Sequence, residues 1–135
     1  MMKIKTPLIY MVDDDEHQLD LVKHIFGRYH ADCRFRSFRD GADLIIHLTH
    51  RLDKQLPDLI ILDWSMPILS GKHILELLNM DQEWRHIPVV VLSASELDEH
   101  RTLSYKLGSK AFIAKAETLQ ELTDTIALIR ELWLD

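Results

Sequence analysis

Four short apolar runs in this chain each end at a residue that can handle a metal ion or a phosphate group. The runs and the residues that follow them are Leu8–Val12 with Asp13, Asp14 and Asp15, 59–62 with Asp63, 89–92 with Ser93, and Ala111–Ala114 with Lys115. In an open parallel α/β sheet, the carboxyl ends of the strands border the ligand crevice. We therefore expect several carboxylates, one hydroxyl and one ammonium group to meet in a single pocket. Such a pocket suits a divalent cation together with a phosphoryl group.

The acidic residues at two of these ends favour magnesium binding. Adjacent carboxylates repel one another and gain most when they share a cation, so Asp13 and Asp14 are better explained as metal-site residues than as helix caps. Asp15 is equally well explained as the cap of the following helix. Asp63 ends the most apolar run, where a carboxylate needs a partner. Magnesium accepts one or two carboxylates and a backbone carbonyl, which Asp14, Asp63 and Ser65 can offer.

The other two strand ends carry groups that suit phosphate. The ammonium group of Lys115 can stabilise phosphoryl oxygens as a point charge, and the hydroxyl group of Ser93 can donate a hydrogen bond to one of them. The predicted site therefore favours phosphoryl chemistry.

A regular alternation of strand and helix patterns positions these residues. Besides the four runs above, a polar segment at 33–38 is typical of a strand at a sheet edge. Helices are predicted at Glu16–Tyr29, from Asp40-Gly41 onward, at Gly71–Met80, at 97–107 with Gly108 as its C-terminal cap, and at 118–134. Five β/α units without a linker or repeat predict one doubly wound α/β domain over residues 1–135.

Apolar spacing predicts the buried faces of the helices. The expected core positions are Leu19, Val22, Ile25, Phe26 and Tyr29 in the first helix, Leu44, Ile45, Leu48 and Leu52 in the second, and Leu119, Leu122, Ile126, Ile129 and Trp133 in the last. Leu128 and Leu132 fall away from the last stripe and are expected to be exposed. They are either isolated surface leucines or part of a partner surface.

Composition narrows the class of protein. The 135 residues are 47% hydrophobic and 28% charged, which is typical of a soluble globular domain. A net charge of −6 argues against nonspecific binding of nucleic acid. Cys33 is the only cysteine, so no intrachain disulfide can form and a reducing compartment fits best. No apolar segment has the length of a membrane span, and we expect a cytoplasmic protein.

The residues at the strand ends resemble the receiver domain of two-component response regulators. The motifs are Val12-Asp13-Asp14, the run Leu62-Asp63-Trp64-Ser65-Met66-Pro67 followed by Gly71, Leu92-Ser93-Ala94, and Gly108 through Lys115. All four occur in order, and the resemblance covers essentially the whole chain. The segment 81–88 also resembles the connector in receivers of the stand-alone, phytochrome-associated type.

The resemblance implies a flavodoxin-like (βα)5 fold with a five-stranded parallel sheet of order 2-1-3-4-5. It also implies that Asp63 accepts a phosphoryl group from a histidine kinase or phosphotransfer protein, with Mg²⁺ as cofactor. Asp14 would bind the metal directly, Asp13 through water, and Ser65 through its carbonyl. Lys115 would bridge carboxylate and phosphate.

Ser93 and Phe112 would form the switch between the two states of such a receiver. The chain would then act as a signalling protein that takes part in its own phosphoryl transfer and dephosphorylation, and not as an enzyme. Output would reach an effector protein, and homodimers could form through the last two β/α units. If the printed sequence is the whole protein, output is expected only through a partner.

Two departures from the family pattern carry expectations of their own. Ala116 stands where the family usually has proline, often after a cis bond. A cis bond before a non-proline residue costs about 2.5–4 kcal/mol, so we expect a trans bond and a shifted loop around Lys115. The separation of Asp14 from Asp63 is a few residues longer than usual, which predicts an extended second helix over 47–55.

Two other classes of protein remain as alternatives. A phosphatase of the haloacid-dehalogenase type uses an aspartyl nucleophile after its first strand, and Asp13 with Asp15 superficially fits that pattern. A degenerate receiver that only binds proteins would take up no phosphoryl group. Labelling with acetyl phosphate or beryllofluoride and magnesium separates these alternatives.

Overall fold

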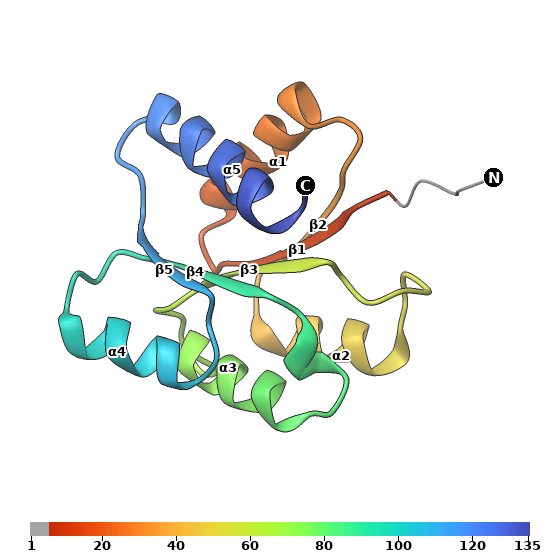
Figure 1. Cartoon of the computed structure of the whole chain (residues 1–135), viewed down its shortest axis with the longest axis vertical. Helices are drawn as coiled ribbons and strands as arrows, with labels where there is room; N and C mark the ends of the chain where they lie inside the picture. Colours follow the sequence, from red (N-terminus) through yellow and green to blue (C-terminus); the bar gives the residue numbers. More distant parts are fainter. Residues whose placement is uncertain (1–5) are drawn as a thin grey trace.

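The computed structural model describes residues 6–135 and contains one parallel sheet between two layers of helices (Figure 1). Its five strands follow the order β2-β1-β3-β4-β5. The strands are β1 Leu8–Val12, β2 Arg34–Phe38, β3 Leu59–Asp63, β4 Val89–Ser93 and β5 Ala111–Ala114. The helices are α1 Glu16–Tyr29, α2 Gly41–His50, α3 Gly71–Met80, α4 Asp98–Lys106 and α5 Leu119–Trp133, with a short 3₁₀ turn at Trp84–His86. The predicted fold and strand order are confirmed.

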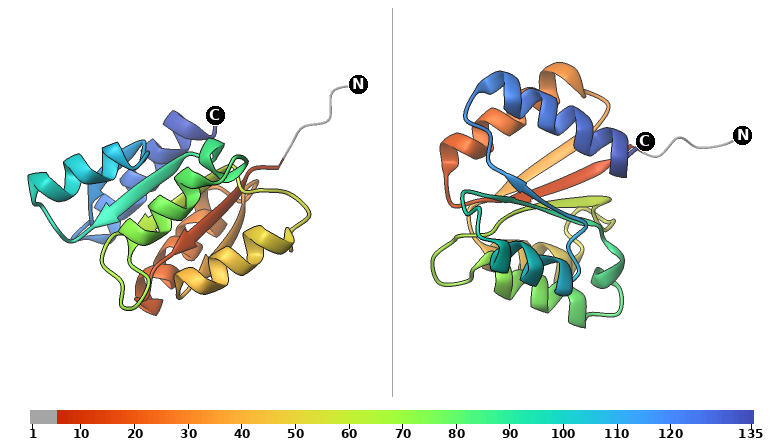
Figure 2. Two further views of the ribbon diagram at one scale, coloured as in Figure 1. Left: turned by 90° about the horizontal axis from the view of Figure 1, so that it is seen from below. Right: turned by 60° about the vertical axis from the view of Figure 1, so that its left-hand side comes forward.

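The two faces of the sheet bury separate hydrophobic clusters. One face packs against α1 and α5, and the other against α2, α3 and α4, as the two views of Figure 2 show. The three central strands β1, β3 and β4 are buried at every position. Their unbroken apolar runs therefore match strands that are covered on both faces. Among residues 6–135, no helix is both long enough and apolar enough to cross a membrane.

Local signals set most of the helix ends. The side chains of Asp15, Asp40, Ser70 and Thr118 each accept a hydrogen bond from the first turn of the following helix. Gly108, with φ of 101°, follows the end of α4 in the conformation that favours glycine. The predicted edge position of the polar strand is confirmed, because β1 is the only strand among residues 6–135 that pairs with β2.

The predicted extension of the second helix is wrong. The helix α2 ends at His50, and Arg51 follows in the left-handed conformation with φ of 47°. The additional residues instead form a turn that carries Asp53 back to the edge strand. There Arg36 donates two hydrogen bonds to the Asp53 carboxylate, at 2.7 and 2.6 Å, and the hydroxyl of Tyr10 donates a third. The longer segment therefore supplies a partner for the basic side chains of β2.

Three predicted core positions are also wrong, because each lies at the end of a stripe. Tyr29, Leu52 and Leu119 are exposed. Tyr29 and Leu119 lie at helix ends, where the apolar face runs past the sheet, and Leu52 lies beyond the end of α2. Leu128 and Leu132 are exposed as predicted, with half or more of each side chain accessible to solvent.

Candidate functional site

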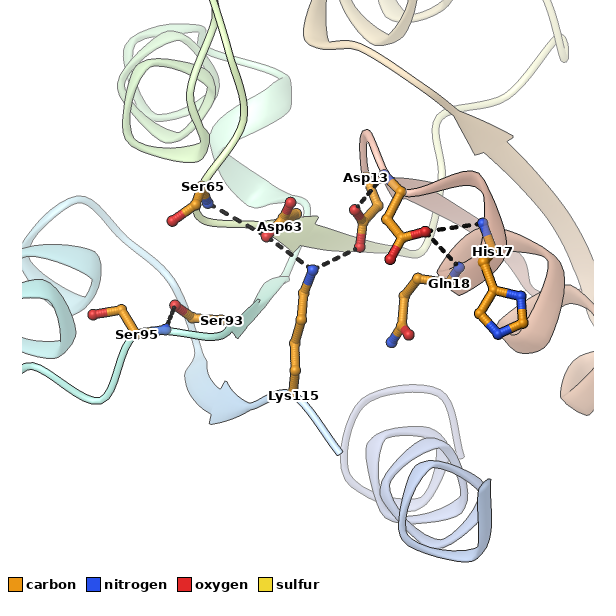
Figure 3. A network of polar contacts seen from close by, with 9 residues as sticks. Asp13, His17, Gln18, Asp63, Ser65, Ser93, Ser95 and Lys115 are labelled. Atoms are coloured by element: carbon orange, nitrogen blue, oxygen red, sulfur yellow. Dashed lines mark hydrogen bonds and ion pairs between the residues drawn. The ribbon is translucent and has the colours of Figure 1, made fainter. Parts of the chain in front are cut away.

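The predicted site residues come together at the carboxyl edge of the sheet. Asp63 ends β3, Ser93 ends β4, and Asp13 and Lys115 follow β1 and β5 directly. The strand register aligns these ends, because Val12 pairs with Leu62, Asp63 with Leu92, and Ser93 with Ala114. Figure 3 shows the Lys115 side chain reaching between the two carboxylates.

Lys115 bridges two buried aspartates. Its Nζ lies 3.1 Å from Oδ2 of Asp13 and 3.3 Å from Oδ1 of Asp63. The peptide bond from Lys115 to Ala116 is trans, as expected. Across this trans bond the Lys115 side chain reaches both carboxylates. Alanine at position 116 is therefore compatible with this ion-pair network.

Three carboxylates form a group that could hold a cation. Oxygen atoms of Asp13, Asp14 and Asp63 all lie within 4.8 Å of one another. The Asp15 carboxylate instead accepts hydrogen bonds from the backbone of His17 and Gln18, at 3.0 and 3.3 Å. Its capping role is thereby confirmed. Carboxylate oxygens suit a hard divalent cation, so the three clustered aspartates fit the magnesium predicted from the sequence.

The site carries more negative than positive charge. Burial and then the neighbouring Asp13 carboxylate raise the pKa of Asp63 to about 7, against the opposing effects of Lys115 and the backbone amide of Ser65. Burial opposes the charge on Lys115, but the two aspartates outweigh this effect and raise its pKa. One ammonium group therefore only partly compensates two carboxylates, and an added cation would be stabilised there.

Gly71 fixes the backbone behind Asp63. A Cβ atom at position 71 would lie 2.4 Å from the carbonyl oxygen of Asp63 and 2.8 Å from Cα of Trp64. The amide of Gly71 also donates a hydrogen bond to the Trp64 carbonyl at 3.1 Å. The start of α3 therefore packs directly on the main chain of the strand that carries Asp63.

The two residues predicted to act as a switch lie in different surroundings. The Ser93 hydroxyl accepts a hydrogen bond from the amide of Ser95 at 2.9 Å and points away from the Lys115 ammonium group (Figure 3). Phe112 is buried, with the Trp64 ring edge-on at a centroid distance of 5.9 Å. Ser93 is thus engaged by its own loop, next to the pocket.

Two α4 residues that the sequence analysis did not identify hold the backbone of Phe112. Arg101 donates a hydrogen bond to its carbonyl at 3.0 Å and places its guanidinium group 5.3 Å from the ring centroid. The Phe112 amide donates to the Tyr105 hydroxyl at 3.3 Å. The i, i+4 spacing of Arg101 and Tyr105 places them on one face of α4, but that spacing does not by itself identify their partner.

Comparisons with known proteins agree with this geometry. The family model of the response regulator receiver domain matches residues 9–127. The response regulator Rcp1 of Synechocystis is 26% identical over 131 residues, which cover 95% of this chain and 89% of Rcp1. The chemotaxis protein CheY-3 of Vibrio cholerae is 29% identical over 125 residues, with 90% and 92% covered.

Two solved structures are similar over nearly their whole length. The phosphorylated cyanobacterial phytochrome response regulator RcpA has a TM-score of 0.89 at 28% identity, with 97% of this chain and 96% of that chain covered. The Mn²⁺-bound form of Rcp1 has a TM-score of 0.85 at 26% identity, with 96% and 95% covered. These matches support the resemblance to phytochrome-associated receivers.

Proposed function

The chain belongs to the response regulator receiver domain family of two-component systems, and on that premise we propose that Asp63 accepts a phosphoryl group from a histidine kinase or a phosphotransfer protein. The observation that carries this proposal is the position of Asp63 at the end of a buried strand, 3.3 Å from the Lys115 ammonium group and clustered with two further aspartates. Phosphorylation of the relative RcpA supports it.

The transfer itself needs little from the protein beyond position and charge. A carboxylate oxygen of Asp63 attacks phosphorus, and an O–P bond forms as the bond from phosphorus to the donor histidine nitrogen breaks. The electron pair stays with that nitrogen, which then takes a proton. Lys115 stabilises the equatorial oxygens, and its existing ion pairs hold it at the required distance.

Magnesium is the proposed cofactor, as the acidic cluster and the Mn²⁺-bound form of the relative Rcp1 support. Asp14 and Asp63 would bind the ion directly, Asp13 through water, and Ser65 through its carbonyl. When bound, the ion supplies positive charge that neutralises the phosphoryl oxygens. Because Asp15 caps α1, we expect Asp14→Ala to weaken magnesium binding at least tenfold and Asp15→Ala to leave it within twofold. A titration followed by Trp64 fluorescence measures both, and equal losses would contradict the assignment.

Phosphorylation would be read by Ser93 and Phe112. In this proposal the Ser93 hydroxyl leaves the Ser95 amide and donates to a phosphoryl oxygen, and Phe112 changes rotamer with it. Because Arg101 and Tyr105 bind the backbone of Phe112, α4 would respond to that movement. The surface formed by α4, β5 and α5, including the exposed Leu128 and Leu132, would then bind an effector or a second copy of the chain.

The remaining properties of the chain fit a signalling protein in the cytoplasm. A net charge of −6 supports protein partners over nucleic acid. We propose that the domain takes part in its own phosphoryl transfer and dephosphorylation without acting on other substrates.

Acetyl phosphate with magnesium tests the function directly. We expect one acyl phosphate per chain, stable in acid and cleaved by hydroxylamine, and its loss in Asp63→Asn. We expect Ser93→Ala to accept phosphate but to respond weakly, and Lys115→Ala to lose most of both. Labelling of Asp13 would favour the phosphatase alternative, and no labelling would favour a receiver that only binds proteins.

A further inference from the structure

The loop between β3 and α3 presents an apolar side chain to solvent beside the phosphoacceptor. This loop, residues 64–70, projects from the body of the molecule in both views of Figure 2. Ile68 lies in the middle of this loop, and its side chain is fully exposed to solvent. An isoleucine in water at this position contributes no buried apolar area to the folded chain.

The backbone at Ile68 is also unfavourable. Its φ is 66°, and the amide of Leu69 donates a hydrogen bond to the Pro67 carbonyl at 2.8 Å, so Ile68 is the central residue of a three-residue turn. The positive-φ form of this turn is rare and strained, and β-branched residues rarely adopt positive φ. Residues with such strained backbone conformations cluster at functional sites, where the strain is part of binding or catalysis.

A residue on each side of Ile68 is held by the fold. Leu69 packs against Gly41 at the start of α2, where an added Cβ would lie 2.7 Å from its Cδ2 atom. Met66 is buried. A cavity of about 240 Å³ lies at this place, lined by residues 66–69 of the loop and by residues 39–42, which include the charged Arg39 and Asp40. The loop therefore presents Ile68 and an adjacent apolar hollow from a fixed base.

The charges around the same edge distinguish this loop from its neighbours. Residues 64–70 carry no charge. Exposed carboxylates lie on the loops and first helix turns after the other four strands, where they are Asp14, Asp15 and Glu16, then Asp40 and Asp43, then Glu96, Asp98 and Glu99, then Glu117 and Glu121. The exposed basic residues Arg39 and Lys72 adjoin the loop, but the carboxylates outnumber them at this edge. A partner that covers this edge must contact an apolar side chain at the β3–α3 loop and carry positive charge opposite the acidic loops.

We infer that Ile68 and the hollow beside it form the apolar anchor for the phosphohistidine-bearing donor protein, whose surrounding surface is basic. This inference rests on the proposed function, because a protein that delivers a phosphoryl group to Asp63 must approach the edge from which the β3–α3 loop projects. Burial of the isoleucine then supplies affinity at the centre of the contact, and the acidic loops orient a basic rim. A small phosphodonor needs neither feature.

The test compares a protein donor with a small donor on the same aspartate. The protein donors are a panel of autophosphorylated histidine kinases that includes a cyanobacterial phytochrome, and the small donor is acetyl phosphate. Three variants are compared with wild type: Ile68→Asn, which removes the apolar group in a residue that tolerates positive φ, Ile68→Leu, which keeps it, and Met80→Asn, which removes an equally apolar exposed group at the far end of α3.

We expect Ile68→Asn to slow transfer from the kinases at least fivefold, with Ile68→Leu and Met80→Asn within twofold of wild type. Labelling by acetyl phosphate should be the same in all four proteins. Equal kinase rates in Ile68→Asn and wild type would overturn the inference, as would an equal slowing with acetyl phosphate or a wild type that no kinase labels.

Sedimentation of the same proteins tests whether a second copy of the chain binds at Ile68 instead. A dimer of the wild type that Ile68→Asn dissociates would assign the anchor to a second copy of the chain and overturn the inference. Failure of acetyl phosphate to label Asp63 would instead refute the proposed function itself, so the two failures are distinguishable.

Discussion

Two aspartates in this protein have almost equally buried side chains, and yet their pKa values shift in opposite directions. The side chains of Asp53 and Asp63 are 3% and 2% exposed. Burial alone raises the pKa of both. For Asp53, hydrogen bonds from Arg36 and Tyr10 outweigh burial and lower the pKa below its usual value. For Asp63, the nearby Asp13 adds to burial, and the pKa rises to about 7.

The difference separates a carboxylate whose charge is satisfied within the fold from the proposed phosphoacceptor. Asp53 has two arginines and a tyrosine as partners, so its charge is satisfied within the chain. Asp63 shares one lysine with a second carboxylate, and the deficit remains for a cation to fill. Perturbed pKa values of this kind are typical of functional sites, although paired structural charges also perturb them.

The largest loss of stability is expected at Gly71, which packs on the backbone that holds Asp63. We expect Gly71→Ala to lower the free energy of unfolding by about 3 kcal/mol, because the new Cβ would overlap main-chain atoms that cannot move aside. Urea unfolding measures the loss. The control is Gly27→Ala, where no atom of the described residues lies within 4 Å of the added Cβ and the helix should gain about 0.5–1 kcal/mol. Similar effects at both glycines would remove the special role of Gly71.

Breaking the satisfied carboxylate should also destabilise the protein. Asp53→Ala leaves Arg36, Arg34 and the Tyr10 hydroxyl without their shared acceptor, and we expect a loss of about 2 kcal/mol at pH 7. Asp32→Ala is the matched control, since Asp32 also accepts two hydrogen bonds from one arginine, Arg130, but is exposed. Its loss should be much smaller. An Asp53→Ala variant as stable as wild type would contradict the comparison.

Substitution of Asp63 is expected to stabilise the protein at high pH, in contrast to substitution of Asp53. Its pKa is raised on folding, so the favourable contribution of the protonated form is complete below about pH 4 and is lost as the pH rises to about 7. Asp63→Asn should therefore unfold at nearly the same urea concentration as wild type at pH 4 and be more stable by about 1–2 kcal/mol at pH 8. Unfolding across this range provides the measurement, and magnesium should reduce the gap. A variant less stable than wild type at pH 8 would show that Lys115 satisfies Asp63 fully.

Much of the fold and the surroundings of Asp63 could be predicted from the sequence, whereas the surroundings of Asp53 could not. Asp63 ends an apolar run, and strand ends in a parallel sheet converge, so local pattern and topology together indicate its partners. Asp53 lies in a polar segment, and its partners are 17 and 43 residues away on β2 and β1. No local spacing relates such residues. Arg51 ends α2 in the left-handed conformation and so creates the turn. Because glycine is the usual residue in that conformation, an arginine there could not be predicted to end the helix.

The exposed ends of the amphipathic stripes show the same limit. Spacing indicates which side of a helix faces the sheet, but not where the sheet stops, so Tyr29 and Leu119 were expected in the core and lie in solvent. For Lys115, alanine in place of the usual proline predicted the trans bond that the structure has, but not the two ion pairs that hold the side chain in the pocket.

The ion pair between Lys115 and Asp13 joins residues that are 102 positions apart. The contact can therefore form only after the first and last strands have joined the same sheet. Until then Asp13 and Asp63 lack this ammonium partner, so the bridging lysine ties the charge balance of the pocket to completion of the sheet.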